Sequence, residues 1–181
     1  MKKKVLSIVA VVLVLCCAIG GTLAWLTDKT GPVVNTFTVG DINIELAESE
    51  NLDLKMVPGN TITNDPFITV KANSEKCWLF VKVVKSATYS DFLDDYKMAA
   101  GWTALTGEEG VYYQVVDAST ANQVFEVLLN NQVTVKGTVT KAQMEGIKNN
   151  TAAAPTLTFT AYAVQFDNVA TAADAWTKAN A

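Results

Sequence analysis

The sequence predicts an all-β protein, a β-sandwich with short helices in its loops, on the basis of three observations. Short apolar stretches with strand-type residues recur along most of the 181-residue chain, separated by turn residues. The chain has neither the alternation of strands and helices that builds a parallel sheet nor a repeat of fixed period. Half of the residues are hydrophobic, which is enough to form a packed core in a single domain of this length.

The first half of the domain contains four predicted strands. Residues 35–46 alternate apolar and polar side chains, with a one-residue slip at Gly40-Asp41 that is typical of a β-bulge. Residues 57–60 (VPGN) place Pro and Gly at the centre of a type II turn. Pro66 interrupts the following strand, because proline cannot donate to a strand ladder. The predicted strands are 35–46, 61–63, 67–70 and 77–85, and we expect the last and most apolar of them to be central in a sheet.

Three short helices are predicted in the second half of the chain. In residues 90–98 apolar side chains recur at helical spacing, opposite three aspartates. Thr140 and Gln143 form a capping-box pattern that opens a helix extending to about Lys148. Residues 171–179 form the last predicted helix, which carries the last tryptophan of the chain.

The same half supplies the remaining strands of the sandwich. Residues 124–129 and 133–139 predict a β-hairpin that turns at Asn130-Asn131. Residues 111–116 predict a separate strand, and residues 157–166 a long last strand with different side chains on its two faces. The total of about eight or nine short strands is typical of a sandwich.

Two residue types are missing, and their absence limits the chemistry of the protein. The chain has no histidine, so a Ser-His-Asp triad, a Cys-His dyad and a histidine zinc helix are excluded. All 14 basic residues are lysine, so the chain cannot grip phosphate or guanine through arginine. With a net charge of −4, it is a poor candidate for nucleic-acid binding. We therefore predict no catalytic residue, no cofactor, no metal ligand and no nucleic-acid partner.

One group of acidic residues requires a separate interpretation. Asp91, Asp94 and Asp95 would lie close together on the helix predicted over residues 90–98. An all-oxygen group of this kind suits Ca²⁺ or Mg²⁺ better than Zn²⁺. We favour a solvated acidic face over a weak cation site.

The N-terminus has the three parts of a secretory signal. Lys2–Lys4 are positively charged, residues 5–19 are apolar apart from one serine, and small residues follow. A cut between Ala24 and Trp25 would separate a signal peptide, 1–24, from a single sandwich domain, 25–181, that functions outside the cell. The alternative is an uncleaved membrane anchor, although the apolar run falls short of the roughly 20 residues that a spanning helix needs.

The exported domain would contain a single cysteine. Without the signal peptide, Cys77 is the only thiol, so no internal disulfide can form. Because Cys77 begins the most apolar strand, we expect a buried structural thiol rather than a reactive one.

Two blocks near the N-terminus resemble those of a known family. GTLAWLTD at residues 21–28 and NTFTVGDI at residues 35–42 are similar to the junction between signal and mature chain in the TasA/camelysin family of SipW-dependent secreted proteins. The resemblance does not extend to residues 88–151. Further segments that look like blocks of this family are 57–59, 65–66, 77–84, 157–166 and 173–176.

The resemblance implies a jelly-roll form of the sandwich and an extracellular structural function. Proteins of this family from Gram-positive bacteria are trimmed by a SipW-type signal peptidase and build biofilm-matrix fibres or lie at the cell surface. The implied partners are further copies of the chain and an accessory matrix protein, with membrane contact only during export. TasA-like fibres join by exchange of an N-terminal strand, which here is residues 25–39. The candidate anchors of this self-assembly segment are Trp25, Leu26, Val33, Val34 and Phe37.

Two alternatives to the fibre subunit remain open. Camelysins carry a metalloprotease label, so the chain could be a cell-surface metalloprotease, although the missing histidines argue against a zinc site and against an enzyme. The other alternative is a monomeric surface adhesin that binds through exposed aromatic side chains such as Trp102, Tyr112 and Tyr113.

The processing site gives a first test. The pocket of a signal peptidase that receives the residue before the cut admits only small side chains. We therefore expect replacement of Ala24 by a bulky residue, such as Ala24→Leu, to block maturation. Mass spectrometry of the secreted protein measures its N-terminus, and unchanged maturation would place the cut elsewhere.

Overall fold

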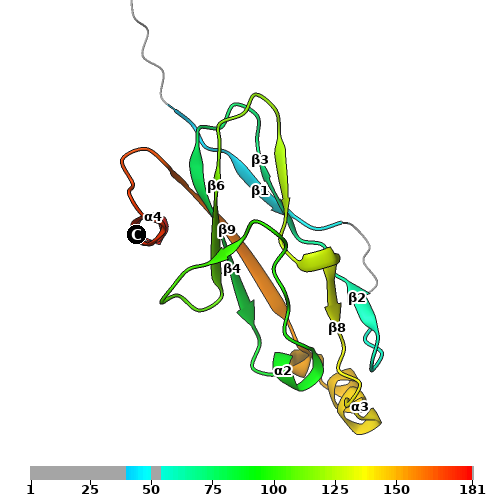
Figure 1. The fold of residues 1–181 in the computed structure, drawn as a ribbon. Coiled ribbons are helices and arrows are strands. Elements are labelled where there is room, and N and C mark those ends of the chain that lie inside the picture. The colour runs from blue at the N-terminus through cyan, green and yellow to red at the C-terminus, as the bar shows by residue number, and fades with distance from the viewer. Residues whose placement is uncertain (1–39, 50–53, 181) are drawn as a thin grey trace, which may run out of the picture. The chain divides into compact units, whose positions relative to one another are not determined.

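Two antiparallel β-sheets pack face to face in the part of the chain that the structure describes, residues 40–49 and 54–180 of a computed structural model (Figure 1). One sheet has the strand order β1-β3-β7 and the other the order β5-β6-β4-β9. The predicted all-β sandwich is therefore confirmed. The strands of these sheets are β1 (Ile44–Ala47), β3 (Phe67–Val70), β4 (Cys77–Lys85), β5 (Thr103–Ala104), β6 (Val111–Val116), β7 (Gln123–Glu126) and β9 (Leu157–Gln165).

β4 is central in the four-stranded sheet, as predicted, because it pairs with β6 on one side and with β9 on the other. Its side chains alternate between two apolar clusters. Leu79 and Val81 point into the core between the sheets, together with Ile68 of β3. Trp78 and Phe80 point to the opposite face of the sheet. Burial on both faces explains the almost continuous apolar run in the sequence of β4.

The C-terminal helix α4 (Ala172–Ala179) covers the outer face of this sheet. Thr171 caps the helix, because its side-chain oxygen accepts a hydrogen bond of 3.1 Å from a backbone N–H of the first turn. The ring of Trp176 lies 5.4 Å from that of Phe80 and 5.1 Å from that of Tyr162. The predicted C-terminal helix is therefore confirmed, and its tryptophan holds it against β4 and β9.

The hairpin predicted across Asn130-Asn131 is wrong. β7 pairs with β3, whereas β8 (Gln132–Thr134) pairs with β2 (Thr61–Thr63). β2 and β3 follow one another along the chain, and β8 and β7 pair with them antiparallel. β7 and β8 therefore run in the same direction as each other. The two asparagines therefore interrupt a continuing strand and do not reverse it.

Extra residues between β7 and β8 explain the interruption. Six positions separate Ile62 from Ile68, whereas eight separate their partners Phe125 and Val133. The 3-10 helix η2 (Leu129–Asn131) contains the additional residues, and its two asparagines have φ of 55° and 53°. Asparagine tolerates this left-handed conformation both in turns and in bulges, so the sequence alone did not distinguish the two.

The helix predicted over residues 90–98 is wrong beyond its first turn. α2 covers only Tyr89–Phe92, and the next residue has extended backbone angles, φ −117° and ψ 146°. That residue, Leu93, is buried and forms an antiparallel bridge with Val135 beyond β8. Pairing and burial of this extended segment outweigh its helical spacing, because tertiary packing overrides local propensity.

The strand predicted over residues 35–46 is shorter in the structure. β1 begins at Ile44, and no strand or bulge forms at residues 40–43. This stretch is held instead by Asp41, whose backbone oxygen accepts a hydrogen bond of 2.9 Å from the N–H of Glu75. Residues 35–39 lie outside the described part of the chain.

Two local predictions are confirmed. Gly59 has a φ of +82°, and the N–H of Asn60 donates to the carbonyl oxygen of Val57 at 3.0 Å, as a type II turn requires. Helix α3 (Lys141–Asn149) begins at the predicted capping box, whose two residues exchange hydrogen bonds of 3.3 and 2.9 Å. A 3-10 helix, η3 (Thr151–Ala153), follows it and leads into β9.

Gly110 lets the loop before β6 approach β4, and this gives a test of the packing. Its φ is +72°, and a Cβ atom there would lie 2.3 Å from the carbonyl oxygen of Val83. Gly107 has a φ of +89°, but no atom lies within 4 Å of its Cβ position. We expect Gly107→Ala to lower the free energy of unfolding by about 1–2 kcal/mol through backbone strain. We expect Gly110→Ala to lower it by about 2 kcal/mol more through the added clash. Urea unfolding measures both, and equal losses would contradict the close approach.

Candidate functional site

The residues predicted to take part in processing and self-assembly lie outside the described part of the chain. This holds for Ala24 and for the whole self-assembly segment, residues 25–39. The described residues nevertheless include the surface that could accept a strand from another molecule. That surface is the free edge of β9, which pairs only with β4 among the described strands.

Two hydrogen bonds at the ends of β9 fix the direction of its backbone groups. The N–H of Phe166 donates to Lys76 and the N–H of Ser86 donates to Thr156, both over 3.0 Å. In an antiparallel ladder this alternation continues along the strand, so even-numbered residues of β9 turn their N–H and C=O groups to β4. The odd-numbered residues turn theirs outward: Leu157, Phe159, Ala161, Ala163 and Gln165.

β9 is a long edge without the features that usually protect an edge. Its nine residues, LTFTAYAVQ, contain no charge and no proline. Natural edge strands are typically short or carry lysine, proline or a bulge, because an open edge templates pairing with another chain. β1 has four residues, one of them Glu45, and β5 has only two residues. Among the edge strands β1, β5 and β9, β9 is therefore the one best suited to strand addition.

The inward side chains of β9 are only partly buried, although they lie on the core face. Leu157, Phe159, Ala161 and Ala163 pack against the cluster between the sheets but keep intermediate exposure. The prediction that these four residues share one face of the strand is confirmed. The inward residues of the neighbouring β4 are 0–4% exposed. A strand added beside β9 would thus cover apolar surface as well as pair backbone groups.

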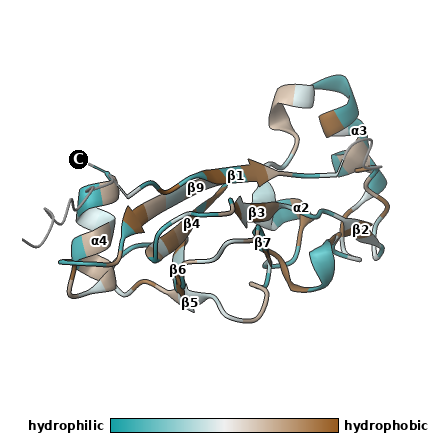
Figure 2. Ribbon diagram, turned by 90° about the horizontal axis from the view of Figure 1, so that it is seen from above, coloured by the Kyte–Doolittle hydropathy of each residue, from teal (hydrophilic) through white to brown (hydrophobic). Residues whose placement is uncertain are grey.

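β1 lies over β9 on the same side of the sandwich, as Figure 2 shows. A hollow of about 370 Å³ opens between the end of β1 and the start of β9. Its lining is mainly apolar and includes Leu46, Ala47, Pro66, Leu157 and Phe159. Apolar side chains of an added strand could be buried there.

The opposite side of the sandwich is covered by the chain that follows α2. The N–H of Ala99 donates to the carbonyl oxygen of Val127 at 2.9 Å. The indole N–H of Trp102 donates to the carbonyl oxygen of Glu126 at 2.8 Å. Trp102, which the adhesin hypothesis treats as an exposed binding residue, is therefore partly buried and holds a loop on β7.

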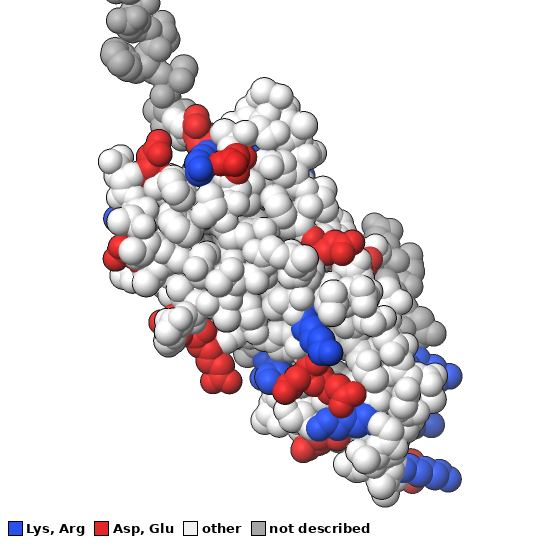
Figure 3. Space-filling model, viewed as in Figure 1, with Lys and Arg blue, Asp and Glu red and all other residues white. Residues whose placement is uncertain are grey.

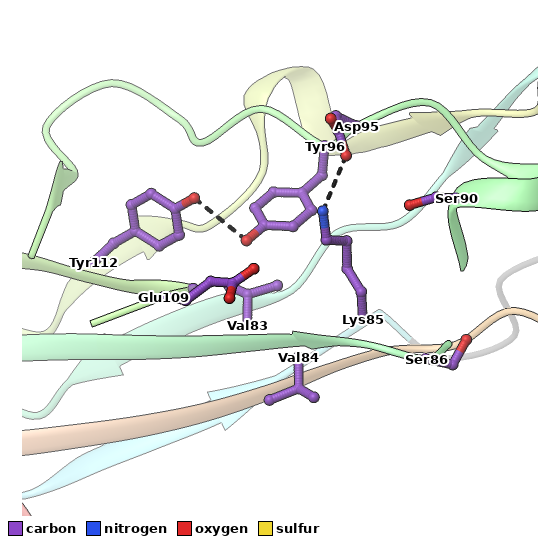
Figure 4. Close-up of a pocket in the computed structure, with 10 residues that line it drawn as sticks. Val83, Val84, Lys85, Ser86, Ser90, Asp95, Tyr96, Glu109 and Tyr112 are labelled. Carbon is purple, nitrogen blue, oxygen red and sulfur yellow. Dashed lines mark hydrogen bonds and ion pairs between the residues drawn. The ribbon is translucent and has the colours of Figure 1, made fainter. Parts of the chain in front are cut away.

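A second hollow, of about 730 Å³, lies where β4 ends, between α2 and the loop before β6 (Figure 4). The ammonium of Lys85 lies 3.0 Å from the carboxylate of Asp95. The hydroxyls of Tyr96 and Tyr112 are 3.3 Å apart. Burial, helped by the hydrogen bond to the second tyrosine, raises the pKa of Tyr96 above its usual value. The carboxylate of Glu109 also lines this hollow.

The aromatic residues of the adhesin hypothesis have different environments. Tyr112 lines the second hollow. Tyr113 points to the opposite face of the sheet, where its ring lies 5.9 Å from that of Trp78 and 6.1 Å from that of Phe80. Only the first of these tyrosines therefore faces a space that a ligand could enter.

The three aspartates considered for a cation site do not share a helix face, because α2 ends at Phe92. One of them, Asp95, pairs with Lys85. No group of three His, Cys, Asp or Glu side chains that could hold a metal ion occurs among residues 40–49 and 54–180. On the described face shown in Figure 3, charged side chains of both signs are interspersed and form no continuous basic surface.

The sequence matches one protein-family model, that of the camelysin metallo-endopeptidase, over residues 1–74. The N-terminal part of the chain is therefore similar to the camelysin family. The described region of the match contains β1, β2 and β3, whereas β4 to α4 lie beyond it. No curated protein and no solved structure matches the chain. Among the helices of the described residues, none is long and apolar enough to cross a membrane.

The free edge of β9 was not recognised from the sequence, although the uncharged run of residues 157–165 offered a signal. Charge-free strands also occur inside sheets, so the run became informative only once the strand order was known. The hollow at the end of β4 left no sequence signal, because its lining comes from segments far apart in the chain.

Cys77 is fully buried, as predicted, and desolvation raises the pKa of its thiol to about 11 from a usual value of 9.0. The unfolded chain therefore loses this proton at lower pH than the folded chain. We expect the free energy of unfolding to fall as the pH rises from about 9 to about 11, because only the unfolded thiol ionises there. Cys77→Ala should lose this part of the pH dependence while other titrations remain. Urea unfolding at several pH values compares the two proteins, and identical slopes would contradict the prediction.

Proposed function

We propose that this protein is an exported structural subunit of biofilm-matrix or cell-surface fibres. In this proposal the N-terminal segment of one copy pairs with the β9 edge of the next copy. The observation that carries the proposal is the long, uncharged free edge of β9, whose inward side chains are only partly buried. Outside the cell such an edge would cause uncontrolled association unless a defined strand occupied it.

The sequence of the N-terminal segment suits this edge. Gly31-Pro32 would end a strand, so the pairing part is residues 33–39 (VVNTFTV), which carry no charge. With the two-residue period of a strand, Val33, Phe37 and Val39 fall on one face, which is apolar except for Asn35. That apolar face could continue the partly buried inner face of β9. Trp25 and Leu26 precede the break and would act as a separate anchor.

The N-terminal residues also support export. The charged start, the apolar run and the small-residue exit are the parts of a secretory signal, with Ala24 before the proposed cut. A SipW-type signal peptidase is the proposed processing enzyme, and an accessory matrix protein is a further proposed partner. Cleavage at this site would create a free N-terminus at Trp25, next to the proposed donor strand.

The proposal assigns the protein no catalytic centre, although the matching family is described as a metallo-endopeptidase. The sequence has no histidine, and a carboxylate-and-thiol set would be an unusual catalytic zinc site. Casein cleavage by highly pure protein, abolished by a chelator, would contradict this part of the proposal.

The test separates the donor strand from the acceptor edge. A chain lacking residues 25–39 keeps the acceptor but has no donor strand. Ala161→Pro keeps the donor but removes an outward N–H at the centre of β9, where an edge strand tolerates proline. We expect both variants to fold, to give unchanged far-UV circular dichroism and to remain monomeric where the parent forms fibres. As a contrast, Tyr162→Pro should unfold the domain, because its N–H faces β4.

Mixing the two monomeric variants completes the test. One supplies a donor and the other an acceptor, so we expect one-to-one dimers and no longer assemblies. Light scattering and electron microscopy distinguish the two products. Fibres from either variant alone would end the proposal, as would a parent protein that begins at Trp25 and stays monomeric at high concentration in every buffer.

A further inference from the structure

The hollow at the end of β4 has a fixed backbone. The N–H of Val83 donates to the carbonyl oxygen of Gly110 at 2.8 Å, and the glycine leaves no room for a Cβ atom beside β4. The neighbouring Glu109 is exposed and lines the hollow. A volume of about 730 Å³ lies within the range of ligand pockets, about 300–1,000 Å³.

The charges that line this hollow do not cancel. Lys85 pairs with Asp95 at 3.0 Å, and its ammonium also lies 5.8 Å from the centre of the Tyr96 ring. Glu109 has no ion pair among the described residues. One carboxylate therefore remains available, and the lining has a net negative charge. An anionic ligand is disfavoured, and a ligand with a positive charge is favoured.

The remaining polar groups are hydroxyls. Tyr96 and Tyr112 present adjoining hydroxyls, 3.3 Å apart, beside the open volume (Figure 4). Each hydroxyl can donate one hydrogen bond and accept others. The serine side chains of Ser86 and Ser90 also line the hollow. Such groups suit a ligand with many hydroxyls of its own, because each can act as donor or acceptor to a sugar ring.

We propose that this hollow binds a glycan that contains amino sugars with free amines. The carboxylate of Glu109 receives the ammonium of the sugar, while Tyr96 and Tyr112 bond its hydroxyls. Lys85 and Asp95 form one wall of the hollow and keep their ion pair when the ligand binds. This function is independent of strand exchange, because none of these residues belongs to β9.

The experiment compares three oligosaccharides of equal length and one peptide. Isothermal titration calorimetry at about 0.15 M salt, where distant charges are screened, measures binding of a glucosamine tetramer to the purified chain. The fully N-acetylated tetramer and a glucose tetramer lack the amine charge, and tetralysine lacks the hydroxyls. We expect both uncharged tetramers and tetralysine to bind at least about tenfold more weakly than the glucosamine tetramer, a difference of about 1.4 kcal/mol.

Two neighbouring glutamates provide a matched pair of variants. Glu109 lines the hollow, whereas Glu108 precedes it in the same loop and does not. We expect Glu109→Gln to raise the dissociation constant of the glucosamine tetramer about tenfold and to remove the preference over the glucose tetramer. Glu108→Gln should leave both values unchanged. Tyr112→Phe, which keeps the ring, should weaken all the sugars by a similar factor.

Several results would overturn the proposal. Absence of binding would contradict the glycan site as a whole. Equal binding of the glucosamine and glucose tetramers would contradict recognition of the amine by the Glu109 carboxylate. Equal losses in Glu108→Gln and Glu109→Gln would indicate general attraction to an acidic surface. Tight binding of tetralysine would make the surface a cation site for peptides. Thermal melting of each variant verifies that it is folded, and none of these results depends on whether fibres form.

Discussion

The burial of β4 on both faces is the constraint on which the rest of the structure depends. A strand whose first five residues are all buried needs a second sheet on one side and another cover on the other. The β1-β3-β7 sheet supplies the first and α4 the second, through the packing of Trp176 on Phe80. The single cysteine of the described residues, Cys77, is free and buried, so these contacts hold the described domain without a disulfide.

Pairing with β4 also determines why β9 is an unusual edge. All nine residues of β9 pair with β4, so the strand is well ordered by one neighbour alone. Its inner face lies on the same core, and it therefore carries apolar and uncharged residues up to the boundary of the sheet. A lysine on that face would protect the edge but would place a charge in the core. The composition that stabilises the sandwich thus also leaves an edge that can accept another strand.

Sequence reasoning succeeded where local chemistry determines local structure. The alternation of β9, the capping box at Thr140 and the turn at Gly59 all depend on residues close together in the chain. Sequence-based prediction failed where residues far apart in the chain determine the local structure. Leu93 is extended rather than helical because it pairs with Val135. The asparagines of η2 lie in an insertion between β7 and β8, and do not form a hairpin turn, because these two strands pair with β3 and β2. For the same reason, neither the free edge of β9 nor the hollow beside Glu109 could be located before the strand order was known.

The family match and the open edge belong to different parts of the chain, and this division has a consequence for assembly. Residues 1–74 match the camelysin family and contain the proposed donor, whereas the acceptor edge of β9 lies beyond the match. Backbone pairing is largely independent of side-chain identity, so an acceptor edge needs few specific residues beyond the absence of charge and proline. In the proposed assembly, the donor segment must suit both the proposed signal peptidase and the receiving edge. A strand-exchange protein can therefore keep a recognisable N-terminus while the remainder of its sandwich changes in sequence.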